Sequence, residues 1–325
     1  MNANMEVTQA KQTKSPSIKN ILKKYNLFFI FLGFILIGSI LSDQFLSVQN
    51  LLNLLQQSSF VGIVSIGMTF VILVAGIDLS VGAVLALTGM LVSILLGTGM
   101  NPILAIVITL IAGAFLGFVN GFVSTKFKVP AFIATLAMMV SARGLALLST
   151  NGEPIYDLPE GFIALGGNVF GKIPFTAIVW IALTIVALVV LKYTTFGRKI
   201  YAVGGNEESS RLSGIPVEKY VTWCFVIAGL LAAVAGILMS AWLTVGQPTA
   251  GTGLELDVIA AVVIGGTSLM GGKGSIGGTF IGVLIMSMIV NIFNLLGLSS
   301  YYQSIFMGLI IVLALIMNQY IINKK

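Results

Sequence analysis

Long apolar runs recur along almost the whole length of this 325-residue chain. The chain is 57% hydrophobic and only 9% charged, and its mean hydropathy is +1.05. A water-soluble domain of this size would carry far more charge on its surface. A run of about 20 apolar residues is long enough to cross the hydrocarbon core of a bilayer as a helix. The sequence therefore predicts an all-α polytopic membrane protein.

We predict ten membrane-spanning helices, which together form a transmembrane domain over residues 27–319. A span can be shorter than about 20 residues where its helix is broken or shielded by neighbouring helices. An even number of spans places both termini on one side of the membrane. The expected spans are 27–42, 58–77, 81–97, 102–123, 130–149, 175–192, 222–243, 257–270, 275–296 and 302–319.

The distribution of basic residues tests this topology independently, because short cytoplasmic loops of membrane proteins are enriched in lysine and arginine. With a cytoplasmic N-terminus and Lys192 at a border, all 17 basic residues except Arg143 and Lys172 lie on the inside. The net charge of +6 follows from this topology and requires no nucleic-acid partner. The inside segments are 1–26, 124–129, 193–221, 271–274 and 320–325, the first and last of them cytoplasmic tails.

Residues 1–26 have a second possible interpretation as the basic region of a signal peptide. Five lysines precede the first apolar run, but no cleavage site of small residues follows it, and the next segment is again hydrophobic. We therefore predict an uncleaved first span.

One polar segment, residues 192–219, contrasts with the rest of the chain. Eight of its 28 residues are charged, and it is longer than a turn between two helices needs to be. Charges and unpaired backbone groups are costly against lipid, so this segment must lie in water. It is available there to a soluble partner, although a plain connecting loop is the simpler alternative.

A short helix is expected inside this polar segment. Asn206 is a suitable N-cap, acidic residues at Glu207 and Glu208 favour the start of a helix, and Arg211 is spaced for an ion pair with Glu207. Gly214 and, two residues later, Pro216 stop the helix. The sequence predicts a helix over 207–212 that projects into the cytoplasm and docks a partner.

Several kinds of enzyme and cofactor chemistry are excluded by composition. The chain has no histidine, so it cannot form Ser-His-Asp or Cys-His nucleophile pairs or a histidine-based metal site. Its single cysteine, Cys224, lies in an apolar run, so no disulfide or cysteine-based metal site is expected. We predict a protein that is not an enzyme and that needs no cofactor or metal.

A glycine-rich stretch at 266–275, GTSLMGGKGS, resembles a phosphate-binding loop at first sight. The pattern G-x-x-x-x-G-K-[ST] requires glycine where Thr267 stands and serine or threonine where Gly274 stands. Both positions fail, so we interpret the stretch as a tight turn between spans. The chain is not expected to hydrolyse ATP itself.

Two glycine-interrupted breaks, at 75–82 and 265–278, divide the shortest spans. Such breaks in corresponding halves of a transporter indicate inverted repeats around a central pathway. A short similarity between 118–123 and 289–294 is consistent with a repeat, although three identities can arise by chance. Glycines spaced by four, Gly113 with Gly117 and another pair at 278 and 282, indicate close helix packing.

A few polar residues within apolar regions are candidates for a solute pathway. Asp78 in the first break is a functional candidate by its position, but it or Ser80 can instead cap the following helix. Interhelical hydrogen bonding is the simpler interpretation of the remaining three, Asn120, Thr135 and Asn291. A hydroxyl-rich solute would use the same amides and hydroxyls. The deeply placed Arg143 needs a carbonyl or carboxylate partner, and Glu153 is one candidate.

Five segments resemble membrane subunits of ATP-binding-cassette (ABC) importers, in the branched-chain amino acid and monosaccharide permease family. They include AGIDLSVG and the loop TTFGRKIYAVGGNEESSRLSGI, and the resemblance runs from about residue 45 to the end. Related permeases for xylose, galactose and autoinducer-2 share the GIDLS element, and the overall likeness implies ribose or a closely related monosaccharide. The five segments are 75–89, 131–139, 194–215, 247–282 and 295–303.

The resemblance implies a type II importer permease that works as a homodimer in the bacterial plasma membrane. Its expected partners are a cytoplasmic ATPase subunit, an extracytoplasmic sugar-binding protein and membrane lipid. The polar loop is similar to the coupling helix that inserts into the ATPase in such transporters. This similarity assigns ATPase coupling to seven residues, Gly197, Arg198, Gly204, Asn206, Glu207, Arg211 and Gly214.

The main alternative is a secondary transporter that couples sugar movement to protons or sodium without an ATPase. Asp78 would then carry the ion. An intramembrane enzyme is disfavoured by the missing histidine and by the lack of paired carboxylates within the spans.

Overall fold

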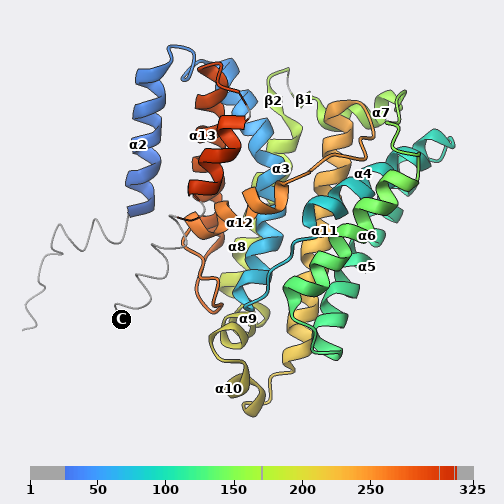
Figure 1. Ribbon diagram of the computed structural model, residues 1–325, viewed down its shortest axis with the longest axis vertical. Coiled ribbons are helices and arrows are strands. Elements are labelled where there is room, and N and C mark those ends of the chain that lie inside the picture. Colours follow the sequence, from blue (N-terminus) through green and yellow to red (C-terminus); the bar gives the residue numbers. More distant parts are fainter. Residues whose placement is uncertain (1–25, 170, 300, 311, 313–325) are drawn as a thin grey trace, which may run out of the picture.

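The computed structural model describes residues 26–169, 171–299, 301–310 and 312. Within these ranges the chain is a bundle of helices with one β-hairpin, whose two strands have two residues each (Figure 1). The predicted tails 1–26 and 320–325 lie outside the described residues, except for Asn26. The elements are α2 Asn26–Leu41, α3 Val48–Leu73, α4 Val81–Gly97, α5 Pro102–Lys126, α6 Ala131–Leu148, α7 Glu160–Ile163, η1 Ala164–Gly166, β1 Asn168–Val169, β2 Ile173–Pro174, α8 Phe175–Tyr193, α9 Thr195–Gly205, α10 Glu207–Leu212, α11 Val217–Leu243, α12 Leu254–Ile264 and α13 Ile276–Leu295.

Six of the described helices, α3, α5, α6, α8, α11 and α13, are long and apolar enough to cross a membrane. The spans predicted at 27–42 and 81–97 correspond to the shorter apolar helices α2 and α4. The span predicted at 257–270 is too long, because α12 ends at Ile264 and a glycine-rich loop follows. Residues 301–310 of the last predicted span are helical, and 313–319 lie outside the described residues.

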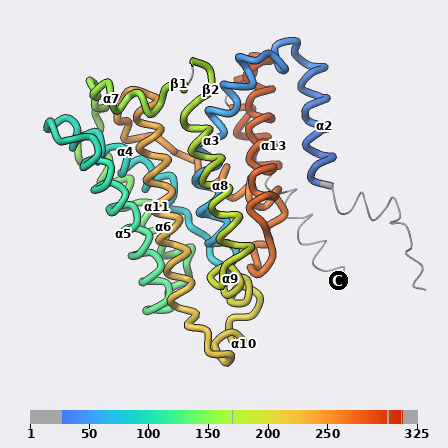
Figure 2. Tube along the Cα trace, turned by 180° about the vertical axis from the view of Figure 1, so that it is seen from behind, coloured from blue at the N-terminus to red at the C-terminus, as the bar shows by residue number. Residues whose placement is uncertain are grey.

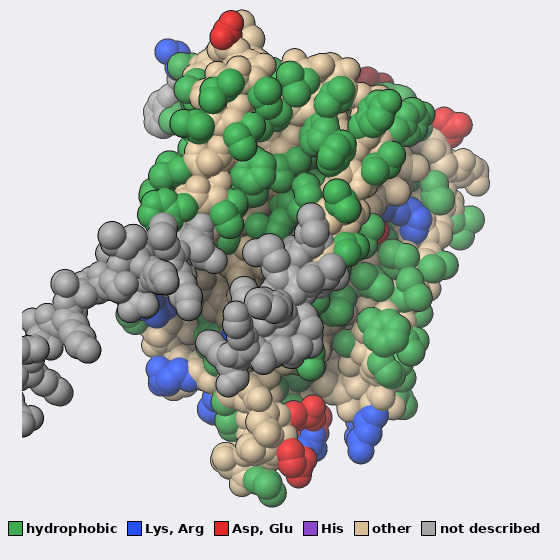
Figure 3. All heavy atoms as spheres, turned by 60° about the vertical axis from the view of Figure 1, so that its left-hand side comes forward, with side chains coloured by type: hydrophobic (Ala, Val, Ile, Leu, Met, Phe, Trp, Pro, Cys, Tyr) green, Lys and Arg blue, Asp and Glu red, His purple; other side chains and the backbone are tan. Residues whose placement is uncertain are grey.

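The surface agrees with a bilayer location. Large apolar side chains such as Ile103, Ile111 and Ile185 are exposed on the outside of the bundle. Figure 3 shows hydrophobic side chains over much of one face, with charged side chains towards both ends and the larger group of them at the end that carries α10. A bilayer can cover such a surface, because lipid tails are as apolar as the side chains they contact.

Helix α11 is the centre of the bundle and packs against α3, α4 and most extensively α5. Three glycines allow the α5 and α11 backbones to approach closely: Gly113 and Gly117 on α5 lie against Gly229 on α11. The predicted role of Gly113 and Gly117 in close packing is confirmed. The pair Gly278 and Gly282 of α13 packs in the same way against the end of α12.

The two predicted breaks are present. Residues 74–80 separate α3 from α4, and residues 265–275 separate α12 from α13. Positive φ angles mark both, at Ala75 (60°) in the first and at Gly271 (81°) and Gly272 (67°) in the second. The similar segments 118–123 and 289–294 fall within α5 and α13, and the inverted repeat stays a prediction.

The hairpin and the short helices α7 and η1 lie together at one end of the bundle, opposite to α10 (Figure 2). In the hairpin, Asn168 pairs with Pro174 and Val169 with Ile173. Phe162 of α7 is fully buried and fixes this segment against α4 and α11. One end of the molecule is thus closed by an ordered connection, and the other carries the polar helices.

The glycine contact between α5 and α11 gives a matched pair of substitutions. An alanine at Gly117 would force its Cβ against the carbonyl oxygen of Phe225, whereas no atom lies within 4 Å of a Cβ at Gly144 on α6. We expect Gly117→Ala to destabilise the protein by about 1–3 kcal/mol despite its better helix propensity. Gly144→Ala should be neutral or stabilising. Thermal unfolding in detergent measures both, and equal midpoints would contradict the close packing.

Candidate functional site

The polar segment between α8 and α11 folds into two helices. Helix α10 covers Glu207–Leu212, as predicted. The residues before it form a second helix, α9 Thr195–Gly205, which the sequence pattern does not predict. Thr194 caps α9 by accepting the N–H of Gly197 at 3.2 Å. The glycines at positions 197, 204 and 205 conceal the helical pattern in the sequence, since glycine disfavours helix interiors.

Helix α9 is fixed to the membrane bundle by its apolar face. Ile200 and Val203 are buried, and the Tyr201 hydroxyl donates a hydrogen bond to the carbonyl oxygen of Gly274 at 2.9 Å. Burial raises the pKa of Tyr201 above its usual value, so the phenol remains a donor at neutral pH. The opposite face, which includes Arg198, is exposed to solvent.

The C-terminal end of α9 touches both breaks. Gly204 lies directly against the carbonyl oxygen of Leu73, where α3 ends, and against the backbone of Gly272 in the second break. The Gly272 N–H donates to the same Leu73 oxygen at 2.9 Å. A Cβ on Gly271 would lie 2.8 Å from the Gly204 oxygen and 2.9 Å from the Ala75 nitrogen. Gly204 is therefore at the junction of α9, the first break and the second break.

Helix α10 projects beyond α9 at the end of the molecule (Figure 1). Asn206 caps it by accepting the Ser209 N–H at 2.8 Å, and Arg211 pairs with Glu207 at 3.0 Å, both as predicted. Arg211 also pairs with Glu218 at 2.7 Å, which ties α10 to the first turn of α11. Gly214, with φ of 78°, ends the helix.

The seven residues assigned to coupling fall into two groups. Four of them shape the backbone by close packing, capping or a positive φ, namely Gly197, Gly204, Asn206 and Gly214. Three present charge to solvent, namely Arg198, Glu207 and Arg211. Leu212 was missed, although its side chain is 81% exposed at the tip of α10. A single leucine closing an otherwise polar helix was the signal for it in the sequence.

A groove of about 650 Å³ lies between α10 and the first break. Its walls combine backbone of the break with charged side chains of α10 and α11, so movement of α10 would alter a space that borders α3. Among its lining residues are Ala75, Gly76, Lys128, Pro130, Glu207 and Arg211.

Four predicted pathway residues meet at the start of α4. The Asn120 amide donates to the Ser80 hydroxyl at 2.9 Å, and that hydroxyl donates to the Asp78 carboxylate at 2.6 Å. Asp78 also accepts the Ser80 N–H at 2.9 Å, within the turn that precedes α4. In the described part of the chain neither Asp78 nor Ser80 accepts an N–H from the first turn of α4, so the predicted cap is not formed. Thr135 of α6 accepts the Leu79 N–H at 3.1 Å. All four side chains are fully buried.

Asn291, the fifth predicted pathway residue, lies elsewhere. Its amide exchanges two hydrogen bonds with the Asn50 amide, at 2.9 and 2.8 Å. It lines a separate cavity of about 190 Å³ with Gln57, Asp257 and Ser287, between α3, α12 and α13. The sequence analysis did not single out Gln57 or Asp257, because the former lies in a polar stretch just before a predicted span and the latter stands at the very start of one.

The deep Arg143 has backbone partners. Its Nη1 donates to the carbonyl oxygens of Pro248 and Ala250, both at 2.8 Å. The predicted need for a carbonyl partner is confirmed, and in the described part of the chain Arg143 forms no ion pair with Glu153.

These features define a class: a multi-pass helical membrane protein with two broken helix pairs and a polar helical element seated on both breaks. Residues 50–315 match the model of the branched-chain amino acid transport system / permease component family, and the chain belongs to this family. It serves transport and not catalysis, as the permease names of its relatives indicate.

The similarity to known permeases extends over nearly the full chain. The ribose import permease protein of Haemophilus influenzae is 44% identical, with 97% of this chain and 98% of the relative covered. That of Bacillus subtilis is 45% identical, with 96% and 98% covered. The D-allose transport system permease protein of Escherichia coli is 38% identical, with 97% of both covered. No solved structure matches this chain.

The contact at Gly204 gives a second testable prediction. A Cβ at Gly204 would collide with the Leu73 oxygen, whereas at the neighbouring Gly205 no atom lies within 4 Å. We expect Gly204→Ala to displace α9 from the bundle. Because the displaced helix is more accessible to protease, tryptic cleavage at Arg198 and Lys199 should become several-fold faster. Gly205→Ala is the matched control. Identical digestion of the two variants would show that α9 is not held by this contact.

Proposed function

We propose that this chain is the transmembrane permease subunit of an ABC importer that moves ribose, or a closely related monosaccharide, into the cell. The observation that carries the proposal is the position of two polar helices: α9 contacts both breaks at Gly204, and α10 projects beyond it from the membrane bundle. Relatives named as ribose import permeases support ribose as the substrate.

A separate ATPase subunit supplies the energy in this proposal. The glycine-rich loop lacks the residues of a phosphate-binding loop, so the chain needs a partner to use ATP. Helix α10 offers that partner an exposed apolar side chain, Leu212, surrounded by the charges of Glu207, Glu208 and Arg211. A central apolar anchor with a polar rim is the usual composition of a protein interface.

The complete importer would contain two copies of this chain, an extracytoplasmic sugar-binding protein and surrounding lipid in the bacterial plasma (inner) membrane. The positive-inside distribution supports ten spans with both termini in the cytoplasm, and the polar segment 193–221 on the same side. The two glycine-interrupted breaks support an inverted repeat.

The sugar pathway is proposed to contain two polar binding sites. The first is the cavity at Asn291, whose amide and carboxylate groups match the hydroxyls of a pentose. The second is the network of Asp78, Ser80, Asn120 and Thr135, whose side chains are buried and hydrogen-bonded to one another or to adjacent backbone. A pathway needs only weak sites, since the solute must also leave each one.

Coupling follows from these contacts. ATP-driven closure of the ATPase pulls on α10, and the Arg211–Glu218 pair and the packing of α9 pass the movement to the ends of α3 and α13. The breaks then rearrange, and access alternates between the two sides of the membrane.

Proteoliposomes provide the direct test. The chain is reconstituted with its ATPase, and radiolabelled ribose, xylose, galactose and allose are each offered with a matching binding protein. We expect ribose uptake that requires ATP and survives collapse of proton and sodium gradients. Uptake that needs an ion gradient and persists without ATP would instead establish the secondary transporter, with Asp78→Asn abolishing it.

A substitution at the tip of α10 tests the docking role. Leu212 contributes little to folding because it is exposed, so Leu212→Asp should leave the thermal midpoint unchanged. It should weaken ATPase binding at least tenfold and reduce ATP-driven uptake accordingly, whereas Leu212→Met should retain both. Full assembly and uptake by Leu212→Asp would show that α10 is not part of the interface with the ATPase.

A further inference from the structure

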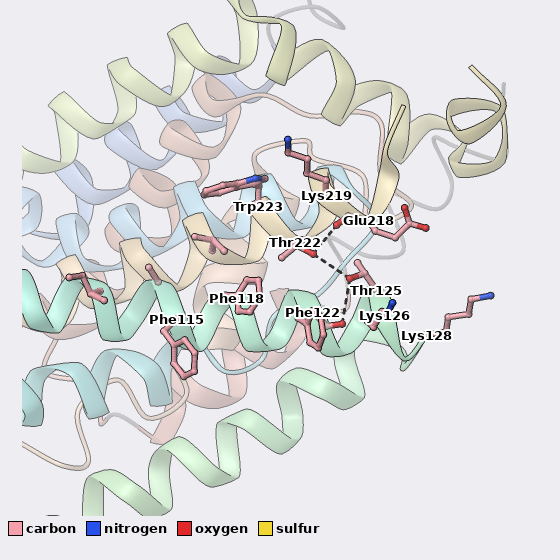
Figure 4. A pocket seen from close by; sticks show the side chains of 13 residues that line it. Phe115, Phe118, Phe122, Thr125, Lys126, Lys128, Glu218, Lys219, Thr222 and Trp223 are labelled. Atoms are coloured by element: carbon pink, nitrogen blue, oxygen red, sulfur yellow. Dashed lines mark hydrogen bonds between the residues drawn. The ribbon is translucent and has the colours of Figure 1, made fainter. Parts of the chain in front are cut away.

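A long groove follows the surface between α5 and α11, as Figure 4 shows. Its volume is about 890 Å³. Phe115, Phe118 and Phe122 of α5 line it from one side, and Trp223 of α11 from the other. From Ile111 to Lys126 the groove extends over about 22 Å of helix at about 1.5 Å per residue, enough for an acyl chain of one bilayer leaflet.

One end of the groove is polar and basic. Lys126 at the end of α5 and Lys219 in the first turn of α11 border it, and both are exposed. Among the described residues no carboxylate forms an ion pair with either lysine. Glu218, which also lines this end of the groove, is paired with Arg211 at 2.7 Å. The positive charge of the two lysines is thus not neutralised within the described part of the chain.

The floor at this end is closed by two threonines. The hydroxyls of Thr125 and Thr222 lie 3.3 Å apart across the groove, and each also donates to a carbonyl of its own helix. The groove therefore has a definite end, with hydroxyls at its floor and lysines at its rim. Its remaining length is apolar.

We propose that this groove is a binding site for one anionic phospholipid. The headgroup phosphate lies between Lys126 and Lys219, and an acyl chain lies along Phe118, Phe122 and Trp223. Basic pockets between helices at a membrane surface select anionic headgroups, and aromatic side chains suit the interfacial region. A second copy of this chain fits less well, because a symmetric partner would bring its own lysines to the same end.

One residue, Glu218, connects the proposed lipid site with helix α10. Glu218, next to Lys219, holds Arg211 of α10. A bound headgroup would therefore lie beside the junction between α10 and α11, where negative lipid charge can influence the position of α10. The binding itself does not depend on the proposed sugar substrate.

Trp223 is a built-in reporter for this site. It is 49% exposed in the groove, while Trp180 is buried and Trp242 lies at the other end of α11. The full chain is reconstituted into bilayers that contain a few per cent of either brominated phosphatidylglycerol or brominated phosphatidylcholine. The Trp223→Phe variant isolates the quenching that belongs to Trp223.

We expect brominated phosphatidylglycerol to quench Trp223 at least twice as strongly as brominated phosphatidylcholine. The Lys126→Gln/Lys219→Gln double variant should lose this preference. Lys192→Gln, on α8 outside the groove, should keep it and serves as the matched control. Equal quenching by both lipids in the unsubstituted chain, or an unchanged preference in the double variant, would overturn the site. Protection of Trp223 from both lipids would instead show that a second copy covers the groove.

Discussion

The organisation of this protein depends on how the backbone polar groups at its two helix breaks find hydrogen-bond partners inside a membrane. A break leaves backbone N–H and C=O groups without helical partners, and lipid offers none. At the first break the Leu73 oxygen accepts the Gly272 N–H, the Leu79 N–H binds Thr135, and the Ser80 N–H binds Asp78. The partners come from the second break, from α6 and from within the turn itself. The break is thus stable only because other elements converge on it.

This requirement explains the link between the water-exposed helices and the membrane bundle. The only side chain that leaves room for α9 against Leu73 and Gly272 is that of glycine, and Gly204 provides it. Helix α9 therefore packs on the same backbone groups that stabilise the breaks. The buried network from Asn120 to Asp78 involves the last residues of the first break, and the groove beside α10 is lined by its first residues. A single junction connects the docking element with the polar groups inside the bundle.

The sequence predicted those features that depend on local chemistry. The Asn206 cap, the spacing of Glu207 and Arg211 and the stop at Gly214 each involve residues a few positions apart, and all are confirmed. Both breaks and the close packing at Gly113 and Gly117 followed from glycine spacing. Helix α9 was missed because its stability comes from burying Ile200 and Val203 against distant elements. The bond from Arg211 to Glu218, and the separation of Asn291 from Asp78, are tertiary features that no local pattern encodes.

In the proposed coupling, α9 moves together with the two breaks during transport. Spin labels at Ala202→Cys on α9 and Lys273→Cys in the second break report on it, because both positions are exposed and the native Cys224 is buried. Pulsed electron–electron distance measurements are made on the assembled importer, first without nucleotide and then trapped with ATP and vanadate. If α9 and the second break move as one unit, we expect this distance to stay constant within about 2 Å, while the distance of a second pair, Ala202→Cys with Lys128→Cys, changes. A large change between α9 and residue 273, with transport intact, would contradict it.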